Sequence, residues 1–130
     1  MTDNINAPEG ILCTQTNEWV LENDGYCTIG LTDFGVEQLG DVVFIELPEV
    51  GSEFVKNEVF ATIESVKAAS EIYMPVSGKV LEVNVDLINS PEMINEDPYE
   101  QGWLIKIEST NLQEDTVGLL EYEDYLEEIA

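Results

Sequence analysis

The stretch VFATIESVKAASEIYMPVSG, residues 59–78, decides the fold. Before its centre, Val59, Ala61 and Ile63 stand at every second position, and after its centre a second apolar series does the same. A period of two is typical of strands that bury one face. The two series therefore predict two antiparallel strands, with Lys67 in the tip of the hairpin between them.

A helix is the alternative for part of this stretch. Good helix formers occur between residues 65 and 73, and Val66, Ser70 and Tyr73 have helical spacing. Pro75 would end any long helix, and the neighbouring β-branched residues favour strands. We therefore expect a hairpin at this position.

Strand-like segments continue on both sides of the hairpin, with turn residues between them. The segments predicted as strands are Glu18–Leu21, Tyr26–Leu31, Asp41–Leu47, Val59–Val66, Ile72–Val76, Gly78–Val85 and Trp103–Glu108. Asn23-Asp24-Gly25 joins the first two and favours a tight hairpin, because Asn and Gly accept positive φ. The pattern predicts a mainly β protein.

Two pairs of segments resemble each other within the chain. Residues 59–65 resemble residues 103–109 and share Ile-Glu-Ser with them, and residues 40–46 resemble residues 78–84. Two copies of a unit of glycine, strand, loop and strand would fold as two related layers. We therefore predict two facing antiparallel layers related by a pseudo-twofold axis.

One short helix and one long loop are expected between the strands. Thr32 can cap a helix over residues 33–39, and Gly40 would end it. Residues 90–102 carry two prolines and several acidic residues with little periodicity, so we expect a long surface loop there.

The end of the chain changes period. With Asp115 or Thr116 as a cap, a C-terminal amphipathic helix is predicted over about residues 116–129. Its apolar residues recur at intervals of three and four: Leu119, Tyr122, Leu126 and Ile129. This helix is expected to cover one end of the β core, and the alternative is a helix that docks on a partner.

Composition limits the possible functions. The chain has 130 residues, 28 acidic side chains, four basic ones and no histidine, so its net charge is −24. This length suits a single domain of residues 1–130, with the β core over about residues 17–110. A surface so acidic is repelled by phosphate, so we expect no nucleic-acid partner.

The chain has few residues that could bind a metal ion or act as an activated nucleophile. Without histidine there is no Ser-His or Cys-His pair, and two cysteines, Cys13 and Cys27, cannot form a four-thiolate site. We expect two reduced thiols, on neighbouring strands, and no metal site. Asn23-Asp24-Gly25 does not fit a calcium loop, because Val20 would occupy its first ligand position.

The sequence also predicts a cytoplasmic, soluble protein without a membrane partner. Its longest apolar run is Val42–Ile45, far too short to span a bilayer. The first ten residues, MTDNINAPEG, contain no basic residue and no apolar core of a signal peptide.

The sequence motifs around Lys67 distinguish it from the other three lysines. A single lysine is usually solvated surface, and this is the expectation for Lys56, Lys79 and Lys106. Around Lys67, the words ESVKAASEIY and PVSG resemble the lipoyl-lysine segment of the glycine cleavage system H-protein family.

Two further words support the same resemblance. LGDVVFIELPEVG, residues 39–51, is similar to the family's first core strand and turn, and NEDPY with GWLIKI, from Asn95 to Ile107, resembles its last loop and strand. The resemblance runs in order from about Trp19 to the C-terminal helix.

The resemblance implies a fold and a role. The fold is a lipoyl-domain-like barrel-sandwich hybrid, and Lys67 would carry lipoate in amide linkage. The lipoyl group would accept the aminomethyl group from the pyridoxal-phosphate glycine decarboxylase (P-protein) and present it to the tetrahydrofolate-dependent aminomethyltransferase (T-protein). Dihydrolipoamide dehydrogenase (L-protein) would then reoxidise it, after a lipoyl ligase or transferase has loaded the arm. The chain itself would be a carrier and not an enzyme.

The chain departs from the family at two places. Asn57 stands where the family has a glycine in a turn, and we expect the turn to persist because Asn tolerates left-handed geometry. Asn17-Glu18-Trp19 replaces a common His-Glu-Trp, which could alter the cleft in which a loaded arm shelters.

Three other functions remain alternatives. A biotin carrier shares the hairpin lysine but usually flanks it with methionines, whereas Val66 and Ala68 flank Lys67 here. An H-like protein could instead donate lipoyl groups to other complexes. A small acidic enzyme would need paired carboxylates with different environments, and the candidate pairs are Glu49 with Glu53 and Glu121 with Asp124.

Overall fold

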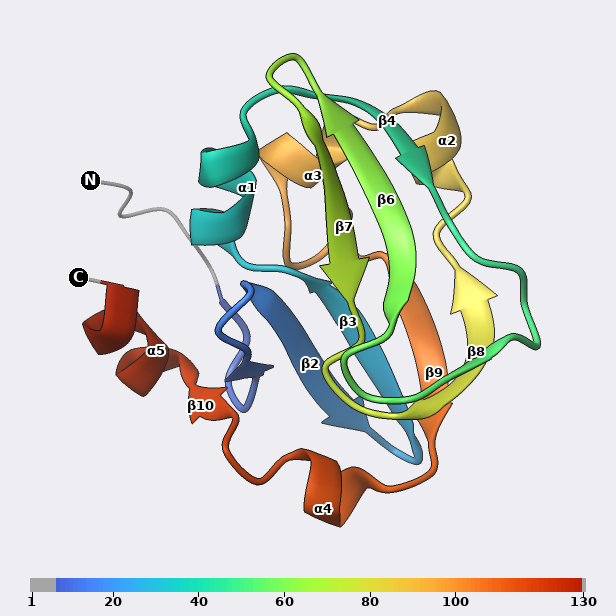
Figure 1. Ribbon diagram of the computed structural model, residues 1–130, viewed down its shortest axis with the longest axis vertical. Helices are drawn as coiled ribbons and strands as arrows, with labels where there is room; N and C mark the ends of the chain where they lie inside the picture. Colours follow the sequence, from blue (N-terminus) through green and yellow to red (C-terminus); the bar gives the residue numbers. More distant parts are fainter. Residues whose placement is uncertain (1–6, 130) are drawn as a thin grey trace.

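Two antiparallel sheets face each other in the computed structural model, which describes residues 7–129 (Figure 1). The larger sheet contains, in spatial order, β10 (Leu120–Glu121), β1 (Leu12–Cys13), β2 (Glu18–Asn23), β3 (Tyr26–Leu31), β9 (Ile105–Ser109), β8 (Gly78–Val83) and β5 (Glu53–Phe54). The smaller sheet contains β4 (Val42–Glu46), β6 (Val59–Ser65) and β7 (Ala69–Tyr73). The predicted mainly β class with two antiparallel layers is confirmed.

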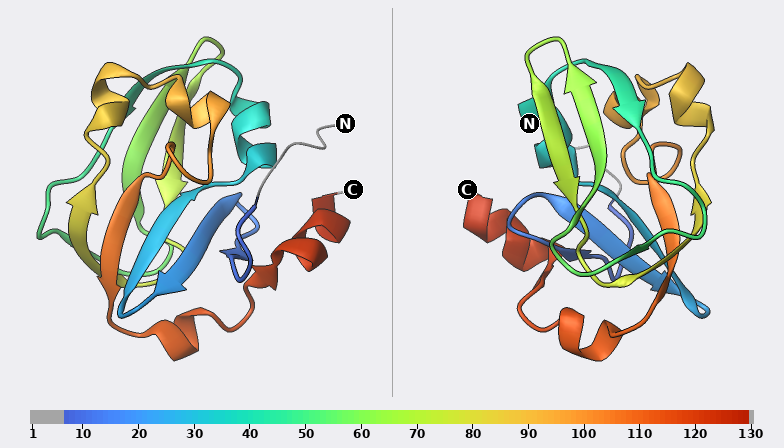
Figure 2. Two further views of the ribbon diagram at one scale, coloured as in Figure 1. Left: turned by 180° about the vertical axis from the view of Figure 1, so that it is seen from behind. Right: turned by 45° about the vertical axis from the view of Figure 1, so that its right-hand side comes forward.

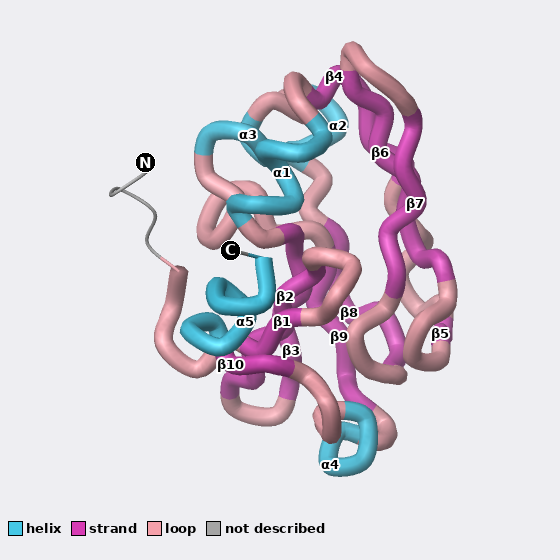
Figure 3. Tube along the Cα trace, turned by 60° about the vertical axis from the view of Figure 1, so that its left-hand side comes forward, coloured by secondary structure: helices cyan, strands magenta, loops and turns pink. Residues whose placement is uncertain are grey.

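The main core lies between the two sheets. Ile63 and Ile72 from the smaller sheet are buried together with Ile29 and Ile105 from the larger one. The smaller sheet stands along one side of the molecule, and its outer face is turned away from the larger sheet (Figures 2 and 3). Burial of one face per sheet explains the period of two in the sequence.

The β6–β7 hairpin is confirmed, and the helix alternative for residues 65–73 is wrong. β6 pairs antiparallel with β7, with Ile63 opposite Ser70 and Glu64 opposite Ala69. Because Ile63 and Ile72 must both reach the core between the sheets, the strand arrangement prevails over local helix propensity.

The internal repeat corresponds to real units, one in each sheet. β4 pairs with β6 and β8 pairs with β9, and each pairing has an irregularity at the same repeat position, between Val42 and Phe44 or between Val80 and Glu82. The register differs by two residues between the copies, a shift that keeps every side chain on its face of the sheet.

Helix α1 (Asp33–Leu39) has the predicted bounds. Its N-cap Thr32 accepts a hydrogen bond from Gly35 N, at 3.0 Å. Gly40 follows the helix with φ 79°, a left-handed conformation that glycine adopts without the penalty of a Cβ atom.

The predicted surface loop over residues 90–102 is wrong in part. Helix α2 (Asp86–Asn89) precedes this segment and helix α3 (Met93–Glu96) lies within it. Ile94 and Tyr99 are buried, so the segment contributes to both core clusters. Isolated apolar residues in a polar stretch produce no period, which explains why the sequence pattern did not reveal them.

The C-terminal helix begins later than predicted. Helix α4 (Leu112–Asp115) ends directly before the predicted start, strand β10 lies within the predicted range, and helix α5 runs only over Tyr122–Ile129. Gly118, with φ 91°, interrupts any helix there, and Leu120 pairs with Cys13 in the larger sheet.

Helix α5 covers a second apolar cluster, as expected for a helix at the end of the β core. Tyr125 from α5 is 1% exposed and packs with Cys13, Trp19 and Tyr99.

The cysteines do not lie on neighbouring strands as predicted, because β2 separates β1, with Cys13, from β3, with Cys27. Both thiols are buried and unbonded to each other.

Candidate cofactor-attachment site

The tip of the β6–β7 hairpin consists of Val66, Lys67 and Ala68, and one serine holds it. Ser65 N donates to Ala68 O at 2.9 Å and closes the loop. The hydroxyl of Ser65 also accepts from Lys67 N, at 3.2 Å, and from Ala68 N, at 3.3 Å. The serine thus satisfies backbone groups that a tight turn would otherwise leave unpaired, and this stabilises one geometry.

A second contact fixes the tip to the neighbouring strand. Val66 N donates to Asp41 O at 3.0 Å, directly before β4 begins. The tip lies at the end of the molecule that also holds α1 and α3, and it is the highest point in Figure 1. The backbone under Lys67 is therefore attached on two sides, to Ser65 and to Asp41.

The Lys67 side chain is exposed and lies across Gly40. A Cβ atom built on Gly40 would lie 3.1 Å from Lys67 Cε and 3.5 Å from Lys67 Cδ. The bare glycine thus leaves room for the lysine stem. Among residues 7–129, Lys67 Nζ has no ion pair with a carboxylate. The amine can be acylated without breaking an interaction within that part of the chain.

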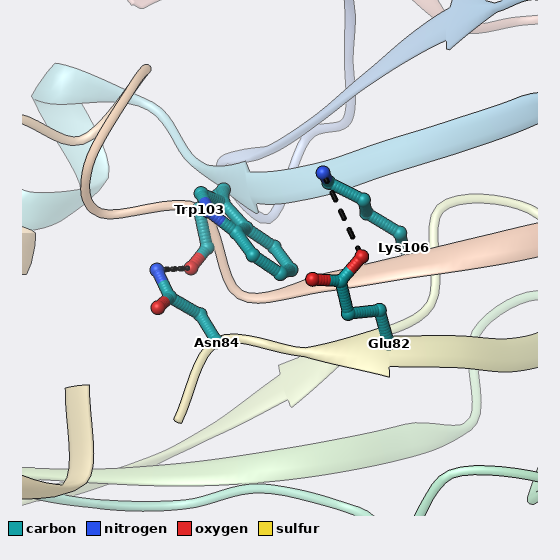
Figure 4. A network of polar contacts seen from close by, with 4 residues as sticks. All are labelled: Glu82, Asn84, Trp103 and Lys106. Atoms are coloured by element: carbon teal, nitrogen blue, oxygen red, sulfur yellow. Dashed lines mark hydrogen bonds and ion pairs between the residues drawn. The ribbon is translucent and has the colours of Figure 1, made fainter. Parts of the chain in front are cut away.

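Two of the other three lysines are engaged, which corrects the expectation of solvated surface. Lys56 Nζ donates to Asp115 O at 2.7 Å, at the end of α4. Lys106 Nζ lies 3.8 Å from Glu82 Oε1 and 4.7 Å from the ring centroid of Trp103 (Figure 4). Asp115 and Glu82 are distant in sequence from the lysines that they contact, so local patterns did not reveal these contacts.

Lys79 is exposed as expected. Its position is nevertheless different from that of Lys67, because it lies inside β8, opposite Glu108 on β9 and Glu53 on β5. A side chain in the middle of a sheet is flanked by the neighbouring strands. Lys67 is the lysine that combines exposure with a place in a hairpin tip.

Two clefts lie beside α1, close to the hairpin. The first has a volume of about 330 Å³ and includes Gly40 and Asn95 together with the carboxylates of Asp33, Glu37, Asp41 and Glu96. The second, of about 240 Å³, includes Asn17, Gly35 and Glu71. The first cleft is strongly acidic, yet the described residues contain no group of three or more potential metal-binding side chains that could hold an ion.

Glu18 is a buried carboxylate to which the sequence analysis assigned no role of its own. It is 1% exposed and accepts hydrogen bonds from Thr14 Oγ1, at 2.6 Å, from the Thr16 hydroxyl and from Tyr73 N, at 3.0 Å. Burial raises its pKa, and the hydrogen bonds offset part of that rise. Glu18 thereby connects β2 in the larger sheet to β7 in the smaller one.

The two departures from the family pattern have clear structural roles. Asn57 has φ 76° and donates from its backbone N to Met74 O at 2.8 Å, so the turn persists as predicted. Asn17 lines the second cleft, and its Oδ1 accepts a hydrogen bond from the Tyr125 hydroxyl at 2.7 Å. The Asn17 side chain is thus engaged with α5.

The carboxylate pairs considered for an enzyme are not sites. Glu49, Glu53, Glu121 and Asp124 are all exposed, so none has the desolvated environment that general acid catalysis requires.

None of the helices in the described residues is long and apolar enough to cross a membrane.

Comparison with known proteins gives a consistent result. The family model described as "Glycine cleavage H-protein" matches residues 11–130. The glycine cleavage system H protein of Halothermothrix orenii is 45% identical over 127 residues, covering 96% of this chain and 99% of that protein. The probable glycine cleavage system H protein of Pyrococcus abyssi is 51% identical, covering 92% of this chain and 89% of its own length.

A solved structure agrees with these sequence relatives. The crystal structure of a glycine cleavage system H protein from Mycobacterium marinum superposes with a TM-score of 0.85. It is 34% identical and covers 93% of this chain and 97% of its own length. The structural similarity therefore covers most of the chain, and the range matched by the family model includes the hairpin with Lys67.

Proposed function

Since the chain belongs to the glycine cleavage H-protein family, we propose that it is the lipoyl-carrying shuttle of a glycine cleavage system, with Lys67 as the attachment site. The observation that carries this proposal is the exposed Lys67 amine in a hairpin tip whose backbone is held by Ser65 and Asp41. A fixed root and an unobstructed amine are the two properties that a swinging arm requires.

The residues around Lys67 fit an amide-linked lipoyl group. Gly40 presents no Cβ to the lysine stem, so the methylenes can lie flat over the backbone. Acylation removes the positive charge of the lysine, and within residues 7–129 no carboxylate ion pair is lost when this happens. The compact Val66 and Ala68 on either side leave the approach open to an attaching enzyme.

The chemistry itself belongs to the bound group and its partners. When bound, lipoate supplies a disulfide that accepts an aminomethyl group and a dithiol that can be reoxidised. The chain's own residues hold the root of the arm in place and leave its end mobile. Tethering raises the local concentration of the reactive sulfur at each partner, which is the contribution of a carrier without catalysis.

The proposed partners are those of the family. They are the glycine decarboxylase, the aminomethyltransferase, dihydrolipoamide dehydrogenase and a lipoyl ligase or transferase, in the cytoplasm. A net charge of −24 favours partners with basic surfaces around their active-site entrances, and it makes association weaker at high salt.

Mass spectrometry of the intact protein after co-expression with a lipoyl-attaching enzyme tests the proposal. We expect the mass of one lipoyl group, located on the peptide that contains Lys67. Lys67→Arg should lose the added mass, whereas Lys79→Arg, a matched change at another exposed lysine, should retain it. A lipoyl group on Lys56, Lys79 or Lys106 would contradict the assignment.

An activity measurement separates this function from its alternatives. Lys67→Ala should abolish glycine–bicarbonate exchange by the decarboxylase while changing the free energy of unfolding by less than about 0.5 kcal/mol, as for other exposed positions. A lipoyl donor for other complexes would transfer its group to a second acceptor protein without supporting the exchange. A biotin carrier would take up biotin, and not lipoate, on Lys67.

A further inference from the structure

Asn95 makes two hydrogen bonds to the segment on which the lysine stem lies. Its side-chain Nδ2 donates to Gly40 O at 2.8 Å, and its Oδ1 accepts from Val42 N at 2.8 Å. These partners are more than 50 residues away in sequence, separated from Asn95 by 55 and 53 positions. Asn95 therefore joins α3 to the backbone on both sides of Asp41.

The same three-residue segment supports the hairpin tip. Asp41 O, between the two groups that Asn95 holds, accepts from Val66 N at 3.0 Å. Gly40, at one end, lies under the Lys67 stem, 3.1 Å from Lys67 Cε to a built Cβ atom. We call Gly40, Asp41 and Val42 the corner segment, because it connects the end of α1 to the start of β4.

We propose that Asn95 is a positioning residue that holds the corner segment, and through it the backbone and the stem of Lys67, in the orientation that attaching and reacting enzymes recognise. The proposal rests on the proposed function, because it assumes that Lys67 is the acylated residue. Asn95 touches neither the amine nor any reacting atom.

One of the two attachments of the tip, the hydrogen bond from Val66 N to Asp41 O, depends on the conformation of the corner segment. Without Asn95, Gly40 O and Val42 N lose their side-chain partners, and the corner segment gains other conformations. Each such conformation moves Asp41 O away from Val66 N. An enzyme that binds only the ordered tip would then find it in a smaller fraction of molecules, which weakens apparent binding.

Local order is measured first, on the unlipoylated protein. Asn95→Ala should speed amide hydrogen exchange at Val66 roughly five- to thirty-fold, as expected for the loss of two hydrogen bonds. It should also speed tryptic cleavage after Lys67. Exchange at core amides such as Ile29 reports global stability and should change less than exchange at Val66.

Asn84→Ala is the matched control. The Asn84 side chain likewise makes two hydrogen bonds to the backbone, both donated by Nδ2, to Gln101 O and to Trp103 O at 2.8 Å each. Figure 4 shows the bond to Trp103 O. Its partners lie outside the corner segment. This variant should therefore leave exchange at Val66 and cleavage after Lys67 at the rates of the unsubstituted protein, after correction for global stability.

Lipoyl attachment gives the second measurement. For Asn95→Ala, the KM of the attaching enzyme for the carrier should rise several-fold with kcat unchanged, because the chemical step uses the same amine. Gly40→Ala should raise the same KM, whereas Gly51→Ala should not. Both glycines have positive φ, 79° and 95°, but a Cβ atom at Gly51 meets nothing within 4 Å.

Unchanged exchange at Val66 in Asn95→Ala would overturn the proposal, and so would an equal effect of Asn84→Ala. An unchanged KM in both Asn95→Ala and Gly40→Ala would also overturn it. Failure of the proposed function looks different, because the unsubstituted protein would then take up no lipoyl group on Lys67, before any variant is compared.

Discussion

At position 57 a residue other than glycine occupies a backbone conformation that favours glycine. Asn57 holds φ 76° in the turn before β6, and Asn17 and Asp24 are the other non-glycine residues with positive φ among those described. Asn and Asp tolerate this region because their short side chains can bond locally. The tolerance explains why the turn persists without glycine.

The effect of replacing Asn57 on stability should depend on whether the new residue has a Cβ atom. Asn57→Gly should keep or raise the free energy of unfolding, and Asn57→Ala should lower it by about 1 kcal/mol, because a Cβ atom disfavours left-handed φ. Urea denaturation measures both. Asn89→Gly, in helix α2, is the control and should be destabilising. Equal stability of the Gly and Ala variants at position 57 would contradict the explanation.

Glu18 should give stability a specific pH dependence. Its folded-state pKa is raised above 4.5 by burial, so the folded protein keeps the proton at pH values where the unfolded chain has lost it. Ionising the buried Glu18 carboxyl lowers the free energy of unfolding. This destabilisation is absent below pH 4.5 and fully present above the folded-state pKa of Glu18. Stability from this group falls as the pH rises through that window.

Glu18→Gln removes this titration. The free energy of unfolding of the variant, relative to that of the unsubstituted protein, should increase as the pH rises from about 4.5 and become constant above the folded-state pKa of Glu18. Urea denaturation across this range measures the difference. Parallel curves for the two proteins would show that the Glu18 carboxyl titrates alike in the folded and unfolded states.

At the scale of elements, helix α1 links the apolar clusters to the site. Its cap, Thr32, is fully buried and bonded both to Gly35 N and to the hydroxyl of Tyr125, at 2.7 Å. The other end of α1 leads into Gly40, on which the Lys67 stem lies. The helix therefore joins α5 at one end to the corner segment at the other.

Thr32→Ala should lower the free energy of unfolding by about 2 kcal/mol, because it removes the cap and leaves the Tyr125 hydroxyl with one partner fewer. Thr32→Ser retains the hydroxyl and should restore most of the loss. Thermal and urea unfolding measure both variants. A Ser variant as unstable as the Ala variant would assign the effect to the lost methyl group and not to the cap.

Sequence patterns predicted some of the helices and strands correctly. The bounds of α1, the β2–β3 hairpin and the β6–β7 hairpin follow from a cap, from turn residues and from a period of two. The late start of α5 and the short strands β1, β5 and β10 did not follow. Strands of two residues are defined by the strands beside them and leave no period in the sequence.

At the scale of the whole molecule, both cysteines report on the integrity of the fold. Cys13 and Cys27 are fully buried, and they lie in different apolar clusters. Burial raises the pKa of Cys13 to about 12 and also raises the pKa of Cys27. The reactive thiolate form is therefore suppressed, and reagents have no access while the sheets are intact.

Thiol labelling should therefore follow unfolding. At mildly alkaline pH we expect no reaction of either cysteine with an aromatic disulfide reagent in the folded protein, and reaction of both when denaturant unfolds it. Lys67→Ala, an exposed change, should leave the rates alone and serves as the control. Rapid labelling of the native protein at Cys13 or Cys27 would contradict their burial.

The sequence by itself determined the β class, the hairpin and its lysine, because alternation, turn residues and the word around Lys67 are local properties of the chain. It did not reveal Glu18 joining the sheets, Lys56 on the end of α4 or Asn95 on the corner segment. Each of these contacts joins residues more than 50 positions apart, and local pattern holds no information on which distant backbone groups meet. Only the packing of the two sheets and of α3 decided those partners.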